Sequence, residues 1–314
     1  MEKAVKKING TRNMKSNRIL FYSILIFIPV IHFLIFYVYI NFNSIVLAFK
    51  KYELTPTSGY VSSLVWFENF AEAWKALTAR AYLIKNSLIF LAVDVCIVTP
   101  LALLFSFYMY KKGKLSSFFK VMLFMPQLLS GVILGLLYKY VSTDVYLWFA
   151  EKMGVEVNGG LLSNIDTRMG TMIFFNVFMG FGVNVLLYVG AMSGVNVSLT
   201  ESAELDGASP MQVLYHIILP LIFPTIATVL IVYISHLFTN QANLYTLLGE
   251  GADKTGTMGY FLYIQAKGSN LVAPNDNMLS YPVLSAMGVI LTAIILPITM
   301  LLRHLMNKYG PSVD

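Results

Sequence analysis

The sequence is poor in charge. Charged residues make up 12% of its 314 residues, about half the share that is usual in soluble domains. Hydrophobic residues reach 57%, above the roughly 45–50% of an ordinary globular chain. So few charges cannot cover the surface of a water-soluble domain of this length. The shortage therefore argues against a soluble protein and favours a chain that lies in a membrane.

Reactive and metal-binding motifs are also scarce. Cys96 is the only cysteine, so no disulfide can form within the chain. The 4 histidines are dispersed without metal-ligand spacing, so we expect no metal site. The Gly113-Lys114 pair is followed by Leu115, which excludes a phosphate loop that ends in Gly-Lys-Ser/Thr. We therefore expect neither catalytic residues nor a resident cofactor in this chain.

The sequence contains several long apolar runs that could span a membrane. About six runs approach the ~20 residues that a helix needs to cross a bilayer. They cover Ile19–Phe42, Leu83–Tyr110, Leu115–Val141, Met169–Met192, Leu221–Asn243 and Tyr281–Leu302. The first run exceeds the roughly 7–15 apolar residues of a cleavable signal peptide, so we expect it to be retained. The runs predict an all-α polytopic membrane protein with about six transmembrane helices in one domain, residues 19–302.

The distribution of basic residues predicts the topology. Lysines and arginines precede the first run and follow the second: Lys3, Lys6, Lys7, Arg12, Lys15, Arg18, Lys111, Lys112, Lys114 and Lys120. This pattern is typical of cytoplasmic segments. An even number of spans then places the N-terminal segment 1–18 and the C-terminal segment 303–314 in the cytoplasm, with the protein in a bacterial cytoplasmic membrane. The scatter of the charges disfavours nucleic-acid binding, although the net charge is +6.

The predicted cytoplasmic loop before the fifth span, Ser198–Pro220, has an ordered pattern. Ser198 and Glu201 have the spacing of a capping box. Gly207 then ends this first short helix, because glycine adopts the left-handed conformation readily. Ser209 and Gln212 form a second capping box around Pro210. Local chemistry therefore predicts two short helices with a sharp bend between them.

The charge of this loop indicates what it contacts. A helical pair that lies on the membrane surface is one possibility, but such anchors usually carry basic residues for anionic lipid. This loop contains acidic residues and neither Lys nor Arg. An acidic, preorganised loop on a membrane bundle favours docking of a soluble partner.

The same loop resembles the EAA loop of ATP-binding-cassette (ABC) importer permeases. The family pattern is Glu-Ala-Ala, three residues, Gly, nine residues, then Ile-x-Leu-Pro. The sequence matches this spacing throughout, and its only departure is Ser202 at the second position, where the family has the first Ala. The resemblance implies that the loop couples the chain to an ATPase through Glu201, Ser202, Ala203, Asp206, Gly207, Ile217, Leu219 and Pro220.

Further stretches are similar to the carbohydrate branch of this family. They are Trp66–Phe70, Lys85–Leu88, Phe124–Gln127, Asn184–Tyr188 and Leu205–Ala208. The resemblance implies a heterodimer with a second permease in the lipid bilayer, two cytoplasmic ATPase subunits that bind ATP and magnesium, and an extracytoplasmic solute-binding protein. The alternative that the chain is a permease for another solute, such as glycerol phosphate or an amino acid, is not excluded by the sequence. An ion-coupled transporter is a weaker alternative, because Asp94 is the only carboxylate well inside a span and packing explains it equally well.

Polar residues within the fourth and fifth spans are candidates for the substrate path. Their spacing of three or four residues predicts one polar helical face on each span: Asn176, Asn184, Tyr233, His236, Asn240 and Asn243. Two interpretations remain open, namely hydrogen bonds between helices or a cavity lined for a sugar. The scarcity of Lys and Arg within the spans favours an uncharged saccharide over a phosphorylated or acidic one.

Overall fold

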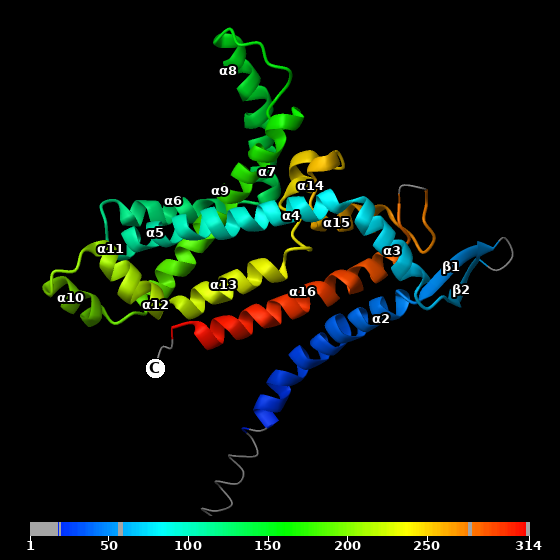
Figure 1. The fold of residues 1–314 in the computed structure, drawn as a ribbon, viewed down its shortest axis with the longest axis horizontal. Coiled ribbons are helices and arrows are strands. Elements are labelled where there is room, and N and C mark those ends of the chain that lie inside the picture. The colour runs from blue at the N-terminus through cyan, green and yellow to red at the C-terminus, as the bar shows by residue number, and fades with distance from the viewer. Residues whose placement is uncertain (1–17, 19, 56–58, 276–277, 312–314) are drawn as a thin grey trace, which may run out of the picture. The chain divides into compact units, whose positions relative to one another are not determined.

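The computed structural model describes residue 18 and residues 20–55, 59–275 and 278–311. The described chain is helical apart from one β-hairpin, which confirms the predicted all-α class with that small exception. It divides into two compact units, one formed by residues up to Trp74 with Ser269–Val289, the other by Lys75–Gly268 with the residues from Ile290 onward. Figure 1 shows the elements of each unit.

The first unit contains the first span and the β-hairpin. The span runs over Leu20–Ala48, six residues beyond the predicted end at Phe42, and its last part is α2 (Ile40–Leu47). Strands β1 (Lys50–Thr55) and β2 (Gly59–Leu64) follow as an antiparallel pair in which Lys50 lies opposite Leu64. Helix α3 (Glu68–Ala79) comes next. The segment between the predicted first and second spans is therefore largely structured.

Asn69 holds the junction of this unit together. Its buried Nδ2 donates hydrogen bonds to the carbonyl oxygens of Ala48 (2.8 Å) and Lys50 (2.7 Å). Lys51 pairs with Glu68 at 2.8 Å, and this hydrogen bond raises the pKa of the Lys51 ammonium. The Trp66–Phe70 stretch therefore has a structural role, because it joins the end of the first span to the start of α3.

Two long spans form the core of the second unit. The first comprises α4 (Ala81–Val93), a π-helical segment (Asp94–Val98) and α5 (Thr99–Tyr110). The second is α9 (Ile165–Ser193), which packs along α5. Buried Ser106 fixes their contact by donating a hydrogen bond to the carbonyl oxygen of Val185 (2.9 Å). These helices confirm the predicted second and fourth spans to within a few residues.

The predicted third span is wrong as a single helix. α6 (Ser116–Leu128) and the following helices α7 (Gly131–Tyr140) and α8 (Tyr146–Lys152) meet at 98°. Leu129 and Ser130 adopt extended backbone at the break. Pro126 lies shortly before it, and proline removes one helical N–H donor and weakens the last turn. The helical structure then continues to Lys152, well past the predicted boundary at Val141.

The remaining elements complete the second unit. α11 (Pro210–Val213), a π-helical segment (Leu214–Ile218) and α12 (Leu219–Leu221) meet α13 (Phe223–Ser235) at 69°. α14 (Leu244–Leu248), a short 3₁₀ turn (Asp253–Thr255) and α15 (Met258–Gly268) follow. These helices occupy much of the segment between the predicted fifth and sixth spans.

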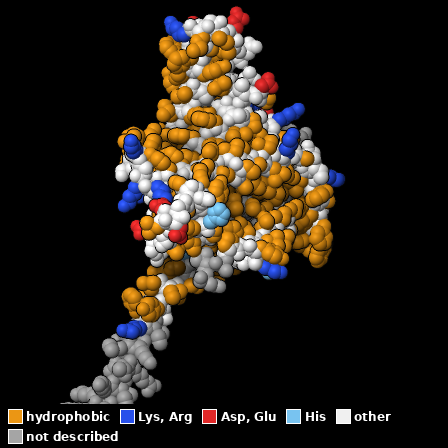
Figure 2. All heavy atoms as spheres, turned by 60° about the vertical axis from the view of Figure 1, so that its left-hand side comes forward, with side chains coloured by type: hydrophobic (Ala, Val, Ile, Leu, Met, Phe, Trp, Pro, Cys, Tyr) orange, Lys and Arg blue, Asp and Glu red, His pale blue; other side chains and the backbone are white. Residues whose placement is uncertain are grey.

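The last helix, α16 (Tyr281–Tyr309), begins at the predicted residue and ends seven residues after the predicted Leu302. It therefore includes most of the predicted C-terminal segment, whereas residues 1–17 of the predicted N-terminal segment lie outside the described residues. Among the described residues, four helices are long and apolar enough to cross a membrane, or up to six if each bent pair is one span. Figure 2 shows one face of the molecule, on which apolar side chains predominate and charged side chains lie at the margins. The cytoplasmic position of both termini stays a prediction.

Candidate functional site

The segment Ser198–Pro220, hereafter the EAA-like loop, begins with helix α10 (Val197–Leu205). The N-cap of this helix is Asn196, whose Oδ1 accepts hydrogen bonds from the N–H (3.1 Å) and the hydroxyl (2.9 Å) of Ser198. The predicted capping box of Ser198 with Glu201 is therefore wrong. Asn is at least as good an N-cap as Ser. Because Asn196 is the N-cap, α10 begins two residues earlier than the predicted cap at Ser198 implies.

The bend of the EAA-like loop has the geometry predicted for it. Gly207 has a φ of +86°. The N–H of Ala208 bonds to the carbonyl of Ala203 (2.9 Å), and that of Gly207 to the carbonyl of Glu204 (3.1 Å). These two bonds form a Schellman motif, which satisfies carbonyls at the end of α10. No atom lies within 4 Å of a Cβ built on Gly207, so the backbone conformation, and not lack of space, requires glycine.

The second part of the EAA-like loop also follows the prediction. The Ser209 hydroxyl accepts a hydrogen bond from the N–H of Gln212 (3.4 Å), and Gln212 Oε1 accepts one from the N–H of Ser209 (2.7 Å). This capping box opens α11 with Pro210 at its first position. The two short helices and their bend are therefore confirmed as local structure, whereas their docking role stays a prediction.

The EAA-like loop has an anchored side and an exposed side. Val213, Leu214 and Ile218 are buried in an apolar cluster with residues of α5 and α9. In contrast, Leu205 is 88% exposed, Tyr215 58% and Met211 53%. The predicted coupling residues divide in the same way: Ala203, Ile217, Leu219 and Pro220 are half-buried, and Glu201, Ser202, Asp206 and Gly207 are exposed. A hollow of about 360 Å³ lies at the bend.

An ion pair ties this loop to the second span. Lys111, just after α5, pairs with Glu204 of α10, and the Lys111 ammonium also lies 5.9 Å from the ring centroid of Phe107. The two partners are 93 residues apart in sequence, so no local pattern predicts the contact.

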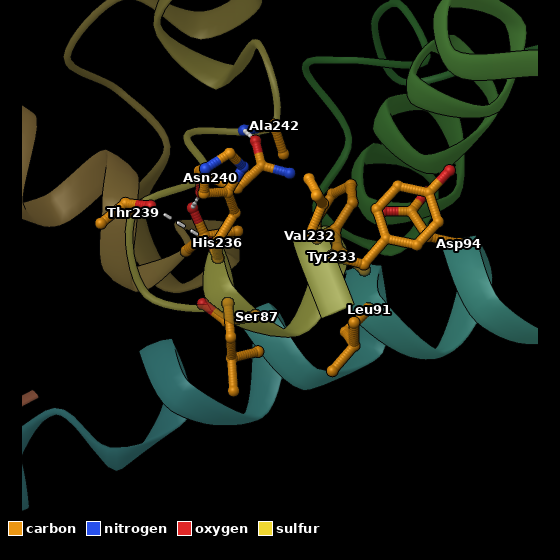
Figure 3. A pocket seen from close by; sticks show the side chains of 12 residues that line it. Ser87, Leu91, Asp94, Val232, Tyr233, His236, Thr239, Asn240 and Ala242 are labelled. Carbon is orange, nitrogen blue, oxygen red and sulfur yellow. Dashed lines mark hydrogen bonds between the residues drawn. The ribbon is translucent and has the colours of Figure 1, made fainter. Parts of the chain in front are cut away.

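A cavity of about 370 Å³ lies between α4 and α13. Figure 3 shows its labelled side chains around the opening between these helices. It is lined by Ser87, Phe90, Leu91, Asp94, Val232, Tyr233, His236, Leu237, Thr239, Asn240, Ala242 and Thr257. The wall combines hydroxyl, amide, imidazole and carboxylate groups with aromatic and aliphatic surface.

The prediction that the fifth span is helical to Asn243 is wrong, because α13 ends at Ser235. Beyond it, the Asn240 side chain accepts a hydrogen bond from the N–H of Ala242 (2.9 Å). Asn side chains compete with helical backbone bonds in this way. Ala242 and Asn243 then have positive φ values of 51° and 55°, which no α-helix contains. Tyr233, His236 and Asn240 consequently do not share a helical face, yet all three line the cavity.

Contacts from other elements hold this irregular segment in place. Asn176 Nδ2 donates to the carbonyl oxygen of Ala242 (2.7 Å), and Thr257 Oγ1 donates to that of Asn240 (3.0 Å). A Cβ on Gly259 would meet the Asn240 carbonyl oxygen at 2.5 Å. Glycine at 259 therefore permits the close approach of α15 to this segment.

The asparagines of α9 connect helices and do not line the cavity. Asn184 Nδ2 donates to the Tyr233 hydroxyl (2.7 Å). Asn243 Nδ2 donates to Asn176 Oδ1 (3.3 Å). Among the six candidates, Asn176, Asn184 and Asn243 thus match the alternative of hydrogen bonds between elements, whereas Tyr233, His236 and Asn240 match that of a lined cavity.

Several residues that line the cavity were not predicted from the sequence. Ser87 lies in the Lys85–Leu88 stretch, which indicated a family resemblance but no cavity, and its hydroxyl accepts a hydrogen bond from the N–H of Met258 (3.0 Å). Thr239 and Thr257 likewise reach the cavity only through the fold. Asp94 is recognisable in the sequence as the only carboxylate well inside a span, but the sequence does not place it in the wall of a cavity.

The bundle of apolar helices with a preorganised polar loop defines a polytopic membrane protein of the permease type. Residues 98–313 match the family described as "Binding-protein-dependent transport system inner membrane component". The chain belongs to this family.

Three relatives are about a quarter identical to the chain over the residues that align. The arabinooligosaccharides transport system permease protein AraP of Bacillus subtilis is 25% identical, with 89% of this chain and 86% of the relative covered. The polygalacturonan/rhamnogalacturonan transport system permease protein YteP of the same organism is 24% identical, with 92% and 88% covered. For the probable starch degradation products permease AmyD of Thermoanaerobacterium thermosulfurigenes, 24% identical, the match covers 49% of this chain and 54% of the relative. The chain thus matches about half the length of that last relative.

Solved structures show the same fold. A bacterial ABC transporter that imports the acidic polysaccharide alginate contains a chain with a TM-score of 0.74 and 21% identity, and the match covers 95% of this chain and 98% of that one. The alginate transporter in complex with its alginate pentasaccharide-bound periplasmic protein gives a TM-score of 0.72 and 19% identity, with 95% and 96% covered.

Proposed function

We propose that this chain is the permease subunit of an ABC importer and forms part of the membrane path for a sugar or oligosaccharide. The observation that carries the proposal is the EAA-like loop, which is rigid by its own hydrogen bonds and presents exposed acidic and apolar side chains together. Exposed apolar side chains on a structured loop mark a contact surface. Within a family of binding-protein-dependent transporters, the occupant of that surface is the ATPase.

The solute class follows from the cavity and from the named relatives. Amide, hydroxyl and imidazole groups can exchange hydrogen bonds with sugar hydroxyls, and the Tyr233 ring offers an apolar surface. The volume of about 370 Å³ falls within the about 300–1,000 Å³ of small-molecule sites. The relatives are named for arabinooligosaccharides and for galacturonan saccharides. We therefore assign Tyr233, His236 and Asn240 to the substrate path.

The proposal includes the assembly and its orientation. A second permease pairs with this chain, two ATPase subunits bind ATP and magnesium, and an extracytoplasmic binding protein delivers the sugar. The EAA-like loop and both termini face the cytoplasm, in keeping with the basic residues near the ends of the first two spans. The sequence of this chain contains no phosphate-binding Gly-Lys-Ser/Thr loop, so ATP hydrolysis belongs to the partners.

Purification of the tagged chain in mild detergent, followed by mass spectrometry, tests the assembly. We expect a second permease of the same family and an ATPase at two copies per complex. An unrelated polytopic protein with the same tag serves as the control. Recovery of the intact chain without any ATPase, under conditions that preserve the second permease, would contradict the proposal.

A further inference from the structure

One carboxyl group, that of Asp94, lies in the cavity wall. Asp94 lies near the middle of the span Ala81–Tyr110, where the helix widens into the π-helical segment Asp94–Val98. The Thr99 hydroxyl donates to the carbonyl oxygen of Asp94 (2.9 Å) and stabilises this turn. Single π-helical turns within α-helices are frequent at functional sites. Here the turn begins at the residue whose side chain borders the cavity.

No basic partner neutralises Asp94 within the described part of the chain. None of the four ion pairs found there includes it, and the cavity lining contains no Lys or Arg. A carboxylate within a membrane span is costly, and such residues usually serve a function. Since Asp94 is only half-buried and borders the cavity, its carboxylate is available to whatever enters.

The neighbouring side chains are held in place around it. The Tyr233 hydroxyl accepts a hydrogen bond from Asn184 (2.7 Å). Figure 3 shows Tyr233 and Asp94 at one end of the cavity and His236 and Asn240 at the other. The acidic end of the cavity is therefore distinct from the end that carries imidazole and amide groups.

A carboxylate at the Asp94 end of the cavity interacts differently with uncharged and carboxylated solutes. A sugar hydroxyl can donate a charge-assisted hydrogen bond to a carboxylate. A carboxylate on the solute would instead meet a like charge in a medium that screens poorly, which lowers its binding by about tenfold or more. A repulsive group of this kind is a common source of specificity. Neither the fold nor the family sets the charge of the cargo, since a structure of the same fold belongs to a transporter of acidic alginate and one relative is named for polygalacturonan, whose residues carry carboxylates.

We propose that Asp94 is a specificity-determining residue that excludes carboxylated saccharides from the cavity and so restricts transport to uncharged sugars. This inference rests on the proposed function and names its substrate class. It assigns to Asp94 a role in selection that a helix-packing role would not produce.

The test uses the complete importer in proteoliposomes with ATP enclosed and the binding protein outside. Uptake is measured for arabinotriose and maltotriose, and for the aldonates made by oxidising their reducing ends. Each aldonate differs from its parent sugar by one carboxylate and by an opened terminal ring, and the difference in shape is the same for every variant. The readout is the ratio of aldonate to parent uptake, compared between the wild type and variants. Because one binding protein delivers both solutes to every variant, its own preference cancels in that comparison.

Asp94→Asn removes the charge at nearly constant shape and should raise this ratio about tenfold. Asp94→Glu keeps the charge and should leave the ratio near the wild-type value. Asp144→Asn removes an exposed carboxylate outside the cavity and serves as the matched control. Asp94→Ser gives the same comparison if Asp94→Asn fails to assemble with the ATPase.

An unchanged ratio in the uncharged Asp94 variants would overturn the inference, even if both solutes were carried more slowly, because a packing role affects the two equally. An equal rise in Asp144→Asn would also overturn it. If the wild-type complex hydrolyses ATP with its binding protein but carries neither parent sugar, the proposed solute class fails and the inference fails with it. If the parent sugars are taken up and the ratio of aldonate to parent uptake is the same in the wild type and the Asp94 variants, the inference fails but the proposed function does not.

Discussion

The EAA-like loop and the cavity are built in opposite ways. The loop takes its shape from bonds between residues two to five apart, such as those around Asn196, Gly207 and Ser209. The cavity takes its shape from bonds between distant elements, for example from Asn86 to the carbonyl oxygen of Gly256, 170 residues away. The loop should therefore respond to changes in local conformation, and the cavity to changes in tertiary contacts. Each prediction below tests one side of this contrast.

The largest effect is expected from Gly207→Val. A β-branched residue at a φ of +86° is strained by about 1–2 kcal/mol, so the bend should open and the ATPase should be lost from purified complexes. Gly207→Asn is the matched control, because asparagine tolerates the left-handed conformation. If Gly207→Val keeps the ATPase and transports normally, local conformation is not what docks the partner.

Asn86→Ala should destabilise the cavity through its tertiary contacts. Asn86 is 7% exposed, and its Nδ2 donates to the carbonyl oxygens of Lys254 (2.9 Å) and Gly256 (2.8 Å). Loss of the donor leaves buried acceptors unpaired, at a cost of about 1–3 kcal/mol. Thermal unfolding in detergent measures it. Asn41→Ala removes a bond only to Tyr37 of the same helix and should change the midpoint less; equal shifts would contradict the contrast.

Asn240→Ala should lower sugar uptake by about two- to tenfold, the value of one hydrogen bond, while ATPase association stays intact. Asn240→Ser is the control for backbone effects, because its hydroxyl can still accept the bond from Ala242. The double variant Asn240→Ala, Asn243→Ala should be at least as impaired, since alanine is also unfavourable at the positive φ of Asn243. Normal uptake by the double variant would remove this segment from the path.

The smallest effect concerns the contact between the loop and the second span. Lys111 and Glu204 are partly exposed, and pairs of this kind contribute about 0.2–1 kcal/mol. Glu204→Lys should weaken the coupling of ATP hydrolysis to uptake about two- to fivefold. The double variant Lys111→Glu, Glu204→Lys should restore part of it. A double variant no better than the worse single variant would show that the pair does not transmit coupling.

The contrast also explains what the sequence could predict. The bend at Gly207 and the capping box of Ser209 with Gln212 depend on neighbouring residues, and both were predicted correctly. The one error in the loop, Ser198 in place of Asn196 as N-cap, arose because two good capping residues lie within three positions. Apolar runs likewise predicted the second and fourth spans closely, because hydrophobic length is a local property.

Sequence reasoning failed where tertiary contacts override local pattern. The intervals between Tyr233 and Asn243 match a helix, but Asn176 and Thr257, far away in the chain, stabilise a non-helical backbone there. The break at Leu129 and Ser130 lies between Pro126 and Gly131, but the apolar run continues through it and therefore reads as one helix. Ser87 and Thr257 enter the cavity wall only because Asn86 fixes α4 against the segment before α15.

The central claim is that ATP hydrolysis, received through the EAA-like loop, moves a sugar past the cavity. Uptake of a radiolabelled oligosaccharide into proteoliposomes that contain the complete complex tests it most directly. We predict uptake that needs enclosed ATP and external binding protein, and that persists when ionophores dissipate proton and sodium gradients. Uptake that an ion gradient drives without ATP would contradict the account and would favour an ion-coupled transporter instead.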